Sequence, residues 1–256
     1  MRGAAEGKLA YCGAAFYITA TVQFVICVAL AASRYGPPAY SPVTTTISDL
    51  QAVGCGAFQG ANVCSPLNIL ANLSVAALGL LIAGGSLLTR SAFPGTGRRD
   101  VAVGLLVVAG MATFANAFTP EDVTFTGDLV TALIAFLGAN FGLIQMGRAM
   151  AGDPGWGRYS AFTEALGTVG AAAIILDGFG AAALLGDGGI EWLIIAPILV
   201  WTLATGARLI AWPRRHLPHT LAPDDSQQES TADGTSVGTA WPAWRFTGGG
   251  DGADKP

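Results

Sequence analysis

Charged residues are scarce in this chain, at 12% against about 25% in an ordinary soluble globular protein. Histidine is rarer still, and its two copies, His216 and His219, both lie toward the C-terminal end. Their position excludes a histidine-ligated metal centre or haem between apolar helices. The chain also has no Walker motif, no nucleotide-binding glycine motif and no G-x-S-x-G motif. No basic patch with interleaved aromatic residues suggests nucleic acid, so we expect no cofactor, no metal and no nucleic-acid partner.

Long apolar stretches take the place of these features, and hydrophobic residues make up 52% of the chain. Six stretches carry few or no charges and are long enough to cross a hydrocarbon layer of about 30 Å. They are Leu9–Ser33, Leu67–Leu88, Val101–Phe118, Leu129–Gly147, Ser160–Leu185 and Ile190–Trp212. They are too continuously apolar for barrel strands, and backbone in lipid must otherwise be helical. The sequence therefore predicts an all-α fold, a polytopic bundle of six transmembrane helices.

The distribution of arginine and lysine predicts how the bundle is oriented. If the N-terminus is cytoplasmic, Arg34 is the only basic residue in an outer segment. We therefore expect a multi-pass protein of the cell (plasma) membrane with both termini cytoplasmic. Residues 1–215 would form the six-helix domain, and the polar residues 216–256 a disordered cytoplasmic tail. A cleaved signal peptide is the alternative for the first helix, but its apolar stretch is longer than a signal peptide needs.

The predicted outer loop, residues 34–66, is the longest connection between helices and contains two of the four cysteines, Cys55 and Cys64. An oxidising outer compartment favours a structural disulfide between them. Free thiols and redox chemistry are the alternatives, although this spacing fits neither a zinc site nor a thioredoxin motif. Residues 44–50 form a short amphipathic segment, which we expect to pack on the mouth of the bundle.

Acidic residues collect on the predicted outer face. They are Asp49, Glu121, Asp122, Asp128, Asp187 and Glu191. Paired carboxylates can do acid–base work or bind a cation, but helix capping or solvated loops explain most of them equally well. Asp128 in particular is expected to cap the fourth helix. Asp177 is expected deeper in the fifth helix, where a charge costs about 2.5–3.5 kcal/mol. It is therefore either a functional group that faces a cavity or a neutral packing contact.

Several short motifs resemble the DUF998 family of uncharacterised prokaryotic integral membrane proteins. The outer loop has Tyr40-Ser41 followed by Ile47-Ser48-Asp49-Leu50. The other matching positions are Pro66 and Asn72, Phe118 and Pro120, and Gly189-Ile190-Glu191. The resemblance covers about Tyr11–Trp212. It implies the six-helix fold and supplies no established activity.

Three functional hypotheses follow from these patterns. The first is a non-enzymatic membrane protein that binds membrane lipids, or another membrane protein, at its outer face. The ligand-binding candidates for this role are Tyr40, Ser48, Asp49, Asp177 and Glu191. The second is a small-solute or proton-coupled transporter that uses Asp177. The third is an intramembrane hydrolase that uses outer-face carboxylates, which requires two of them to lie within a few ångströms of each other. No catalytic residue is predicted.

Overall fold

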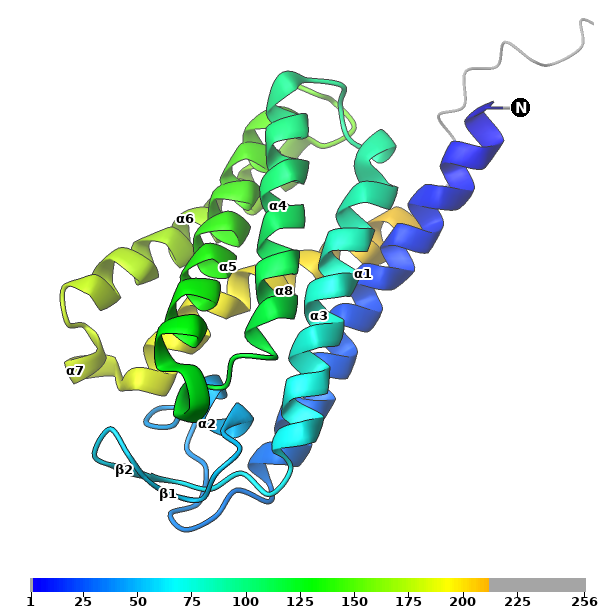
Figure 1. Ribbon diagram of the computed structural model, residues 1–256. Helices are drawn as coiled ribbons and strands as arrows, with labels where there is room; N and C mark the ends of the chain where they lie inside the picture. The colour runs from blue at the N-terminus through cyan, green and yellow to red at the C-terminus, as the bar shows by residue number, and fades with distance from the viewer. Residues whose placement is uncertain (1, 212–256) are drawn as a thin grey trace, which may run out of the picture. The chain divides into compact units, whose positions relative to one another are not determined.

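A computed structural model of the protein describes residues 2–211 (Figure 1). In chain order the elements are α1 (Arg2–Ala32), α2 (Ile47–Gln51), β1 (Gly56–Phe58), β2 (Ala61–Val63), α3 (Asn68–Thr89), the 3-10 helix η1 (Arg90–Ala92), α4 (Gly97–Asn116), α5 (Glu121–Met150), α6 (Gly157–Gly178), α7 (Ala182–Leu185) and α8 (Asp187–Ala211). The expected tail, residues 216–256, lies outside the described residues.

Six helices are long and apolar enough to cross a membrane, which confirms the predicted bundle. The six spans are Glu6–Ala32, Asn68–Ala92, Gly97–Asn116, Glu121–Met150, Gly157–Gly178 and Asp187–Ala211. Large apolar side chains on their outer faces are exposed, for example Ile69 at 72% and Leu73 at 63%. So much exposed apolar surface suits lipid as the surrounding solvent. The chain is therefore a multi-pass membrane protein.

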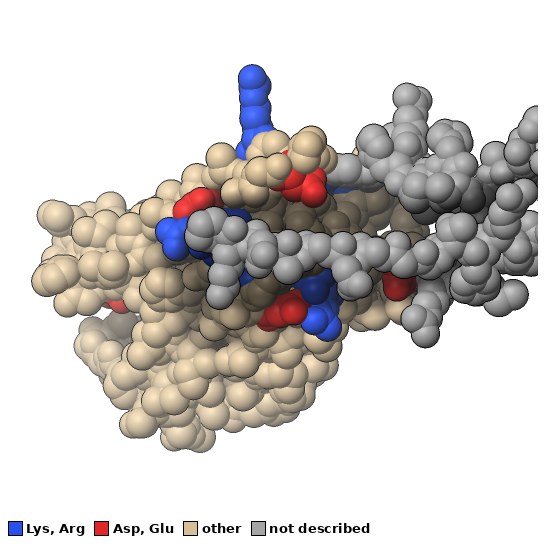
Figure 2. Space-filling view, turned by 90° about the horizontal axis from the view of Figure 1, so that it is seen from above, with Lys and Arg blue, Asp and Glu red and all other residues tan. Residues whose placement is uncertain are grey.

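The helices alternate in direction, so their connections gather at two opposite ends (Figure 1). The α2 end comprises residues 33–67, 117–120 and 179–186. The basic end comprises residues 90–96 and 151–156, beside the start of α1. Figure 2 looks onto the basic end and shows Lys and Arg side chains gathered there beside a few acids. Within residues 2–211, Arg34 is the one basic residue at the α2 end.

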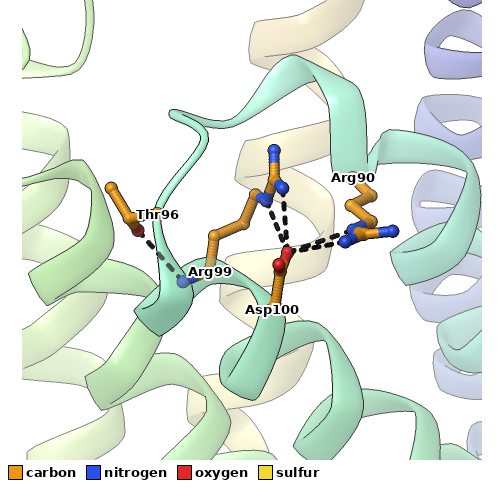
Figure 3. Close-up of polar contacts among 4 residues, drawn as sticks. All are labelled: Arg90, Thr96, Arg99 and Asp100. Atoms are coloured by element: carbon orange, nitrogen blue, oxygen red, sulfur yellow. Dashed lines mark hydrogen bonds and ion pairs between the residues drawn. The ribbon is translucent and has the colours of Figure 1, made fainter.

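A shared carboxylate organises the α3–α4 connection at the basic end (Figure 3). Asp100 Oδ1 accepts hydrogen bonds from Arg90 Nε at 3.1 Å and from Arg99 Nε at 2.9 Å. Thr96 caps α4, because its hydroxyl accepts the Arg99 backbone N–H at 3.2 Å. Ion pairs as exposed as Arg90–Asp100 contribute little to stability, so we assign them the local role of fixing where α4 begins.

Two helix boundaries differ from the sequence prediction. The fourth membrane helix, α5, begins at Glu121 and not near Leu129, so the prediction that Asp128 caps it is wrong. Non-helical backbone at Thr124 (φ −143°, ψ 69°) separates its first turn from the rest. The fifth membrane helix, α6, ends at Gly178, because Gly180 takes a left-handed φ of +83° and redirects the chain toward α7.

The predicted disulfide between Cys55 and Cys64 is present and closes the β1–β2 hairpin. The two strands are antiparallel, and Gly56 pairs with Val63 just inside the disulfide. An isolated two-stranded hairpin is at best marginally stable in water. The disulfide therefore contributes much of the stability of the β1–β2 hairpin.

We expect Cys55→Ser to lower the free energy of the local opening of this hairpin by about 2–3 kcal/mol, since the disulfide restricts the unfolded loop. Hydrogen exchange of the amides in residues 56–63 would measure the change, and reduction of the wild-type protein should reproduce it. Cys12→Ser is the control, because Cys12 is a free thiol in α1. Equal exchange in the Cys55 variant and the wild type would contradict this role.

Candidate ligand-binding site

The short helix α2 covers the bundle at the α2 end. Its first turn is fixed by a capping box, in which Asp49 Oδ2 accepts the Thr46 N–H at 2.8 Å and Thr46 Oγ1 accepts the Asp49 N–H at 2.9 Å. Ile47 and Leu50 are buried, at 3% and 0% exposure, and form the apolar face of α2. The predicted amphipathic segment therefore does pack on the bundle, and Asp49 serves first as the capping group.

Polar contacts hold α2 against two membrane helices. On α8, Glu191 Oε2 accepts the backbone N–H of Ile47. On α3, the Asn72 and Gln51 amides are joined by two hydrogen bonds, from Gln51 Nε2 to Asn72 Oδ1 at 3.0 Å and from Asn72 Nδ2 to the Gln51 carbonyl at 2.9 Å. Ser65 Oγ also donates to the Leu50 carbonyl at 2.7 Å. A five-residue helix with no membrane span of its own is thus held by a handful of hydrogen bonds.

Beneath α2 lies a cavity of about 70 Å³ that extends between the membrane helices. Its walls are mainly apolar and come from α1, α3, α4, α5 and α8, with Phe24, Leu78 and Ile198 among them. Its polar lining residues are Ser48, Gln51, Thr113, Asn116, Asn140 and Glu191. A water needs about 10–15 Å³, so the cavity has room for several waters or part of a narrow ligand.

Carboxyl groups from α2 and α5 lie near Ser48. The Asp49 and Glu121 carboxyl groups lie within hydrogen-bonding reach of each other, and one oxygen of Glu121, Oε1, is buried without a hydrogen-bond partner among residues 2–211. Asp128 accepts from Asn116 Nδ2 at 2.8 Å and from Ser48. Acidic side chains therefore accumulate at this end of the bundle, where Arg34 is the one described basic residue.

Tyr40 and Tyr35 flank the site from the loop that precedes α2. The Tyr40 hydroxyl accepts the Trp192 Nε1–H at 3.3 Å, and its ring meets that of Tyr35 edge-on, with 6.0 Å between centroids. Burial, reinforced by the negative charge of Asp49, raises the pKa of Tyr35 to about 12. The pKa of Tyr40 is also raised, because the effect of burial exceeds the opposing effect of its hydrogen bond with Trp192. Both hydroxyls are therefore neutral at physiological pH.

The structure brings together most of the residues predicted from sequence. Ser48 and Glu191 line the cavity, Asp49 lies at its cover, and Tyr40 contacts Trp192 next to Glu191. Asp177 is the exception. It lies in the last turn of α6 with its side chain exposed, and it does not line the cavity. The expectation that it lies deep in the membrane and reaches a cavity is wrong, because α6 ends one residue later.

Sequence reasoning did not single out the most deeply buried polar group of the cavity, Asn140. Its side chain is 0% exposed, and its Nδ2 donates to the carbonyls of Phe136 at 3.0 Å and Ile194 at 3.2 Å. Its Oδ1 has no hydrogen-bond partner in the part of the chain that the structure describes, and it lies against Gly170 of α6. A lone amide in an apolar helix was the available signal, but sequence does not reveal which way the helix is rotated.

The model of one protein family matches residues 18–208, which include every element of this site. The chain belongs to the DUF998 family. That family is described as proteins of unknown function, and the match confirms the resemblance predicted from the outer-loop motifs. No curated protein and no solved structure matches the chain. Membership of DUF998 thus agrees with the fold, and the activity has to be argued from the site.

Proposed function

We propose that this DUF998 protein binds an amphiphilic molecule from the membrane in the cavity beneath α2, without catalysing a reaction. We further propose that it resides in the plasma membrane with both termini cytoplasmic, so that the α2 end faces outward. The grouping of Lys and Arg at the basic end supports this orientation, since cytoplasmic loops carry the excess of basic residues.

The observation that carries the proposal is the division of the cavity into two chemical zones. Glu191, Ser48 and Gln51 lie at its end beneath α2, whereas Leu78, Ile82 and Ile198 lie along its walls between the membrane helices, where Asn140 is a polar exception. Ligand pockets commonly combine apolar walls with a few polar groups that orient the ligand. A molecule with an apolar chain and a polar head matches both zones at once.

Binding of such a molecule would require α2 to move. The cavity has about 70 Å³ of room, well below the roughly 300–1,000 Å³ of pockets that enclose drug-sized ligands. The polar contacts that would have to open are the Ile47–Glu191 bond, the Gln51–Asn72 pair, the Ser65–Leu50 bond and the Ser48–Asp128 bond. We therefore assign α2 the role of a lid that is held closed by α3 and α8.

A hydrolase that uses outer-face carboxylates is the second candidate, because Asp49 and Glu121 meet its requirement for two close acids. Asp49 is, however, already committed to the Thr46 cap. Intact recovery of the bound amphiphile after prolonged incubation would favour binding, and recovery of cleaved products would favour hydrolysis. A transporter that uses Asp177 has no support from this geometry, because Asp177 does not line the cavity.

Filling the cavity should abolish binding. Ala135 lines the cavity and is 6% exposed, so Ala135→Phe would place an aromatic ring in the space that the apolar chain needs. We expect the dissociation constants of saturated C16 amphiphiles (hexadecylamine, hexadecanol and hexadecanoic acid) to rise at least ~10-fold, a loss of about 1.4 kcal/mol. Native mass spectrometry of the full chain in phosphatidylcholine nanodiscs would count retained ligand.

The matched control is Ala172→Phe, at an exposed position on α6. It makes the same chemical change on the outer surface of the bundle and should leave binding unaltered. If none of the three amphiphiles bound the wild-type protein more than empty nanodiscs did, the proposed function would be wrong. Equal binding by Ala135→Phe and Ala172→Phe would also contradict it.

A further inference from the structure

Most of the hydrogen-bond donors that line the cavity are already used within the protein. The lining side chains with donor groups are Ser48, Gln51, Thr113, Asn116 and Asn140. Each donates to a partner: the acceptors are side chains for Ser48, Gln51 and Asn116, and backbone carbonyls for Thr113 and Asn140. The Gln51 amide has a second N–H, but a ligand head that needs several donors from the protein would have to break an existing bond.

The acceptors that line the cavity are used far less. Glu191 has two carboxylate oxygens, and its one hydrogen bond in the structure is from the Ile47 N–H to Oε2. Asn140 Oδ1 has no hydrogen-bond partner among the described residues, but it lies against Gly170 of α6, so the free oxygen of Glu191 is the acceptor that a ligand head would reach. A carboxylate out of bulk water is costly unless a positive charge or several donors compensate it. Within residues 2–211, the single basic residue at this end, Arg34, is exposed and does not line the cavity.

Building on the proposed function, we propose that the bound amphiphile has a protonated amine as its head, which pairs with Glu191 beneath α2. An ammonium group brings three donors and no acceptor, which complements a site where most donors are committed and Glu191 has an oxygen available. It also supplies the positive charge that the cavity lining lacks. Asp49, Glu121 and Asp128 add further acidic groups at the same end of the bundle, which favours the approach of a cation over that of an anion.

An organic cation suits the described residues better than a metal ion. Within residues 6–211, no three His, Cys, Asp or Glu side chains are grouped so that they could hold a metal. The apolar walls that continue from Glu191 to Ile194 and Ile198 would contact a hydrocarbon chain attached to the cation. The ligand class is therefore a long-chain amine or an aminolipid.

The test compares three saturated C16 probes that differ only in the head: hexadecylamine, hexadecanol and hexadecanoic acid. We expect the wild-type protein in phosphatidylcholine nanodiscs to bind the amine about 10–100-fold more tightly than the alcohol, since charge-assisted hydrogen bonds contribute roughly 1.5–3 kcal/mol. Glu191→Gln should remove that preference and change alcohol binding less than about threefold. Glutamine keeps an oxygen for the Ile47 N–H, so α2 should remain in place.

The control is Glu164→Gln at the basic end, where Glu164 pairs with Arg148 far from the cavity. It removes the same charge and should keep the preference for the amine. Equal binding of amine and alcohol by the wild type, or an unchanged preference in Glu191→Gln, would overturn the inference but leave the proposed function standing. Failure of all three probes to bind would instead refute the proposed function itself.

Discussion

Gly110→Leu should prevent most of the chain from folding into its native bundle. Gly110 on α4 faces Gly79 on α3, and a Cβ atom added to Gly110 would lie 2.5 Å from the Gly79 carbonyl oxygen and 2.8 Å from the Ala83 amide nitrogen. These neighbours are backbone atoms and cannot rotate away. Small residues at such positions are what let membrane helices approach closely. The two helices would have to move apart along much of their contact.

We expect the free energy of unfolding to fall by at least ~3 kcal/mol, the upper part of the usual range for overpacking, because backbone is displaced. Unfolding in a denaturing detergent, followed by near-UV circular dichroism, would measure it. The effect should extend to the cavity, because α3 and α4 both contribute to its walls. Ligand binding and stability should therefore be lost together in this variant.

Gly104→Leu on the same helix is the matched control. Nothing lies within 4 Å of a Cβ atom added to Gly104, which is exposed on the outer face of α4. Leucine there should be neutral or slightly stabilising, by up to about 1 kcal/mol, since it has the higher helix propensity. Equal losses in the two variants would mean that close approach of α3 and α4 is not what requires glycine at position 110.

The six membrane helices could be predicted from the sequence because uncharged stretches of this length have few other structures available in lipid. The prediction of helix boundaries was less accurate where the end of a helix carries charged residues. The first turns of α5 carry Glu121, Asp122 and Asp128, so hydropathy placed its start near Leu129. In the fold two of these acids accept hydrogen bonds. Asp122 accepts the Val53 and Gly54 N–H groups, and Asp128 accepts from Asn116.

The candidate site could be predicted only where its geometry depends on residues that are close together in the sequence. The capping box around Asp49 is encoded within a few residues, and Glu191 lies at the start of a clear apolar stretch. Asn140 could not be assigned, because its role depends on which face of α5 meets α8. Asp177 was misplaced because the end of α6 depends on the left-handed backbone at Gly180, which composition does not reveal.

Gly188→Ala should loosen α2 without unfolding the bundle. Gly188 is in the first turn of α8, and a Cβ atom there would overlap the Thr45 carbonyl oxygen and lie 2.9 Å from that of Pro42. The loop just before α2 therefore rests directly on this glycine. One methyl group would displace Thr45 and, with it, the adjoining Thr46 cap, and the Ile47–Glu191 hydrogen bond would lengthen or break.

Overpacking of this kind typically destabilises a packed state by about 1–3 kcal/mol, which here would raise the population of the open form of α2 by ~5–150-fold. Hydrogen exchange of the α2 amides, Ile47–Gln51, should accelerate by that factor, whereas exchange in the middle of α3 should not change. Gly189→Ala is the control, because the nearest atoms to its added Cβ lie 3.8 Å away, at ordinary contact distance. Gly189 also donates its N–H to the Val43 carbonyl at 3.0 Å, and alanine retains that bond. Unchanged protection of α2 in Gly188→Ala, or equal acceleration in both variants, would show that the start of α8 does not hold the lid in place.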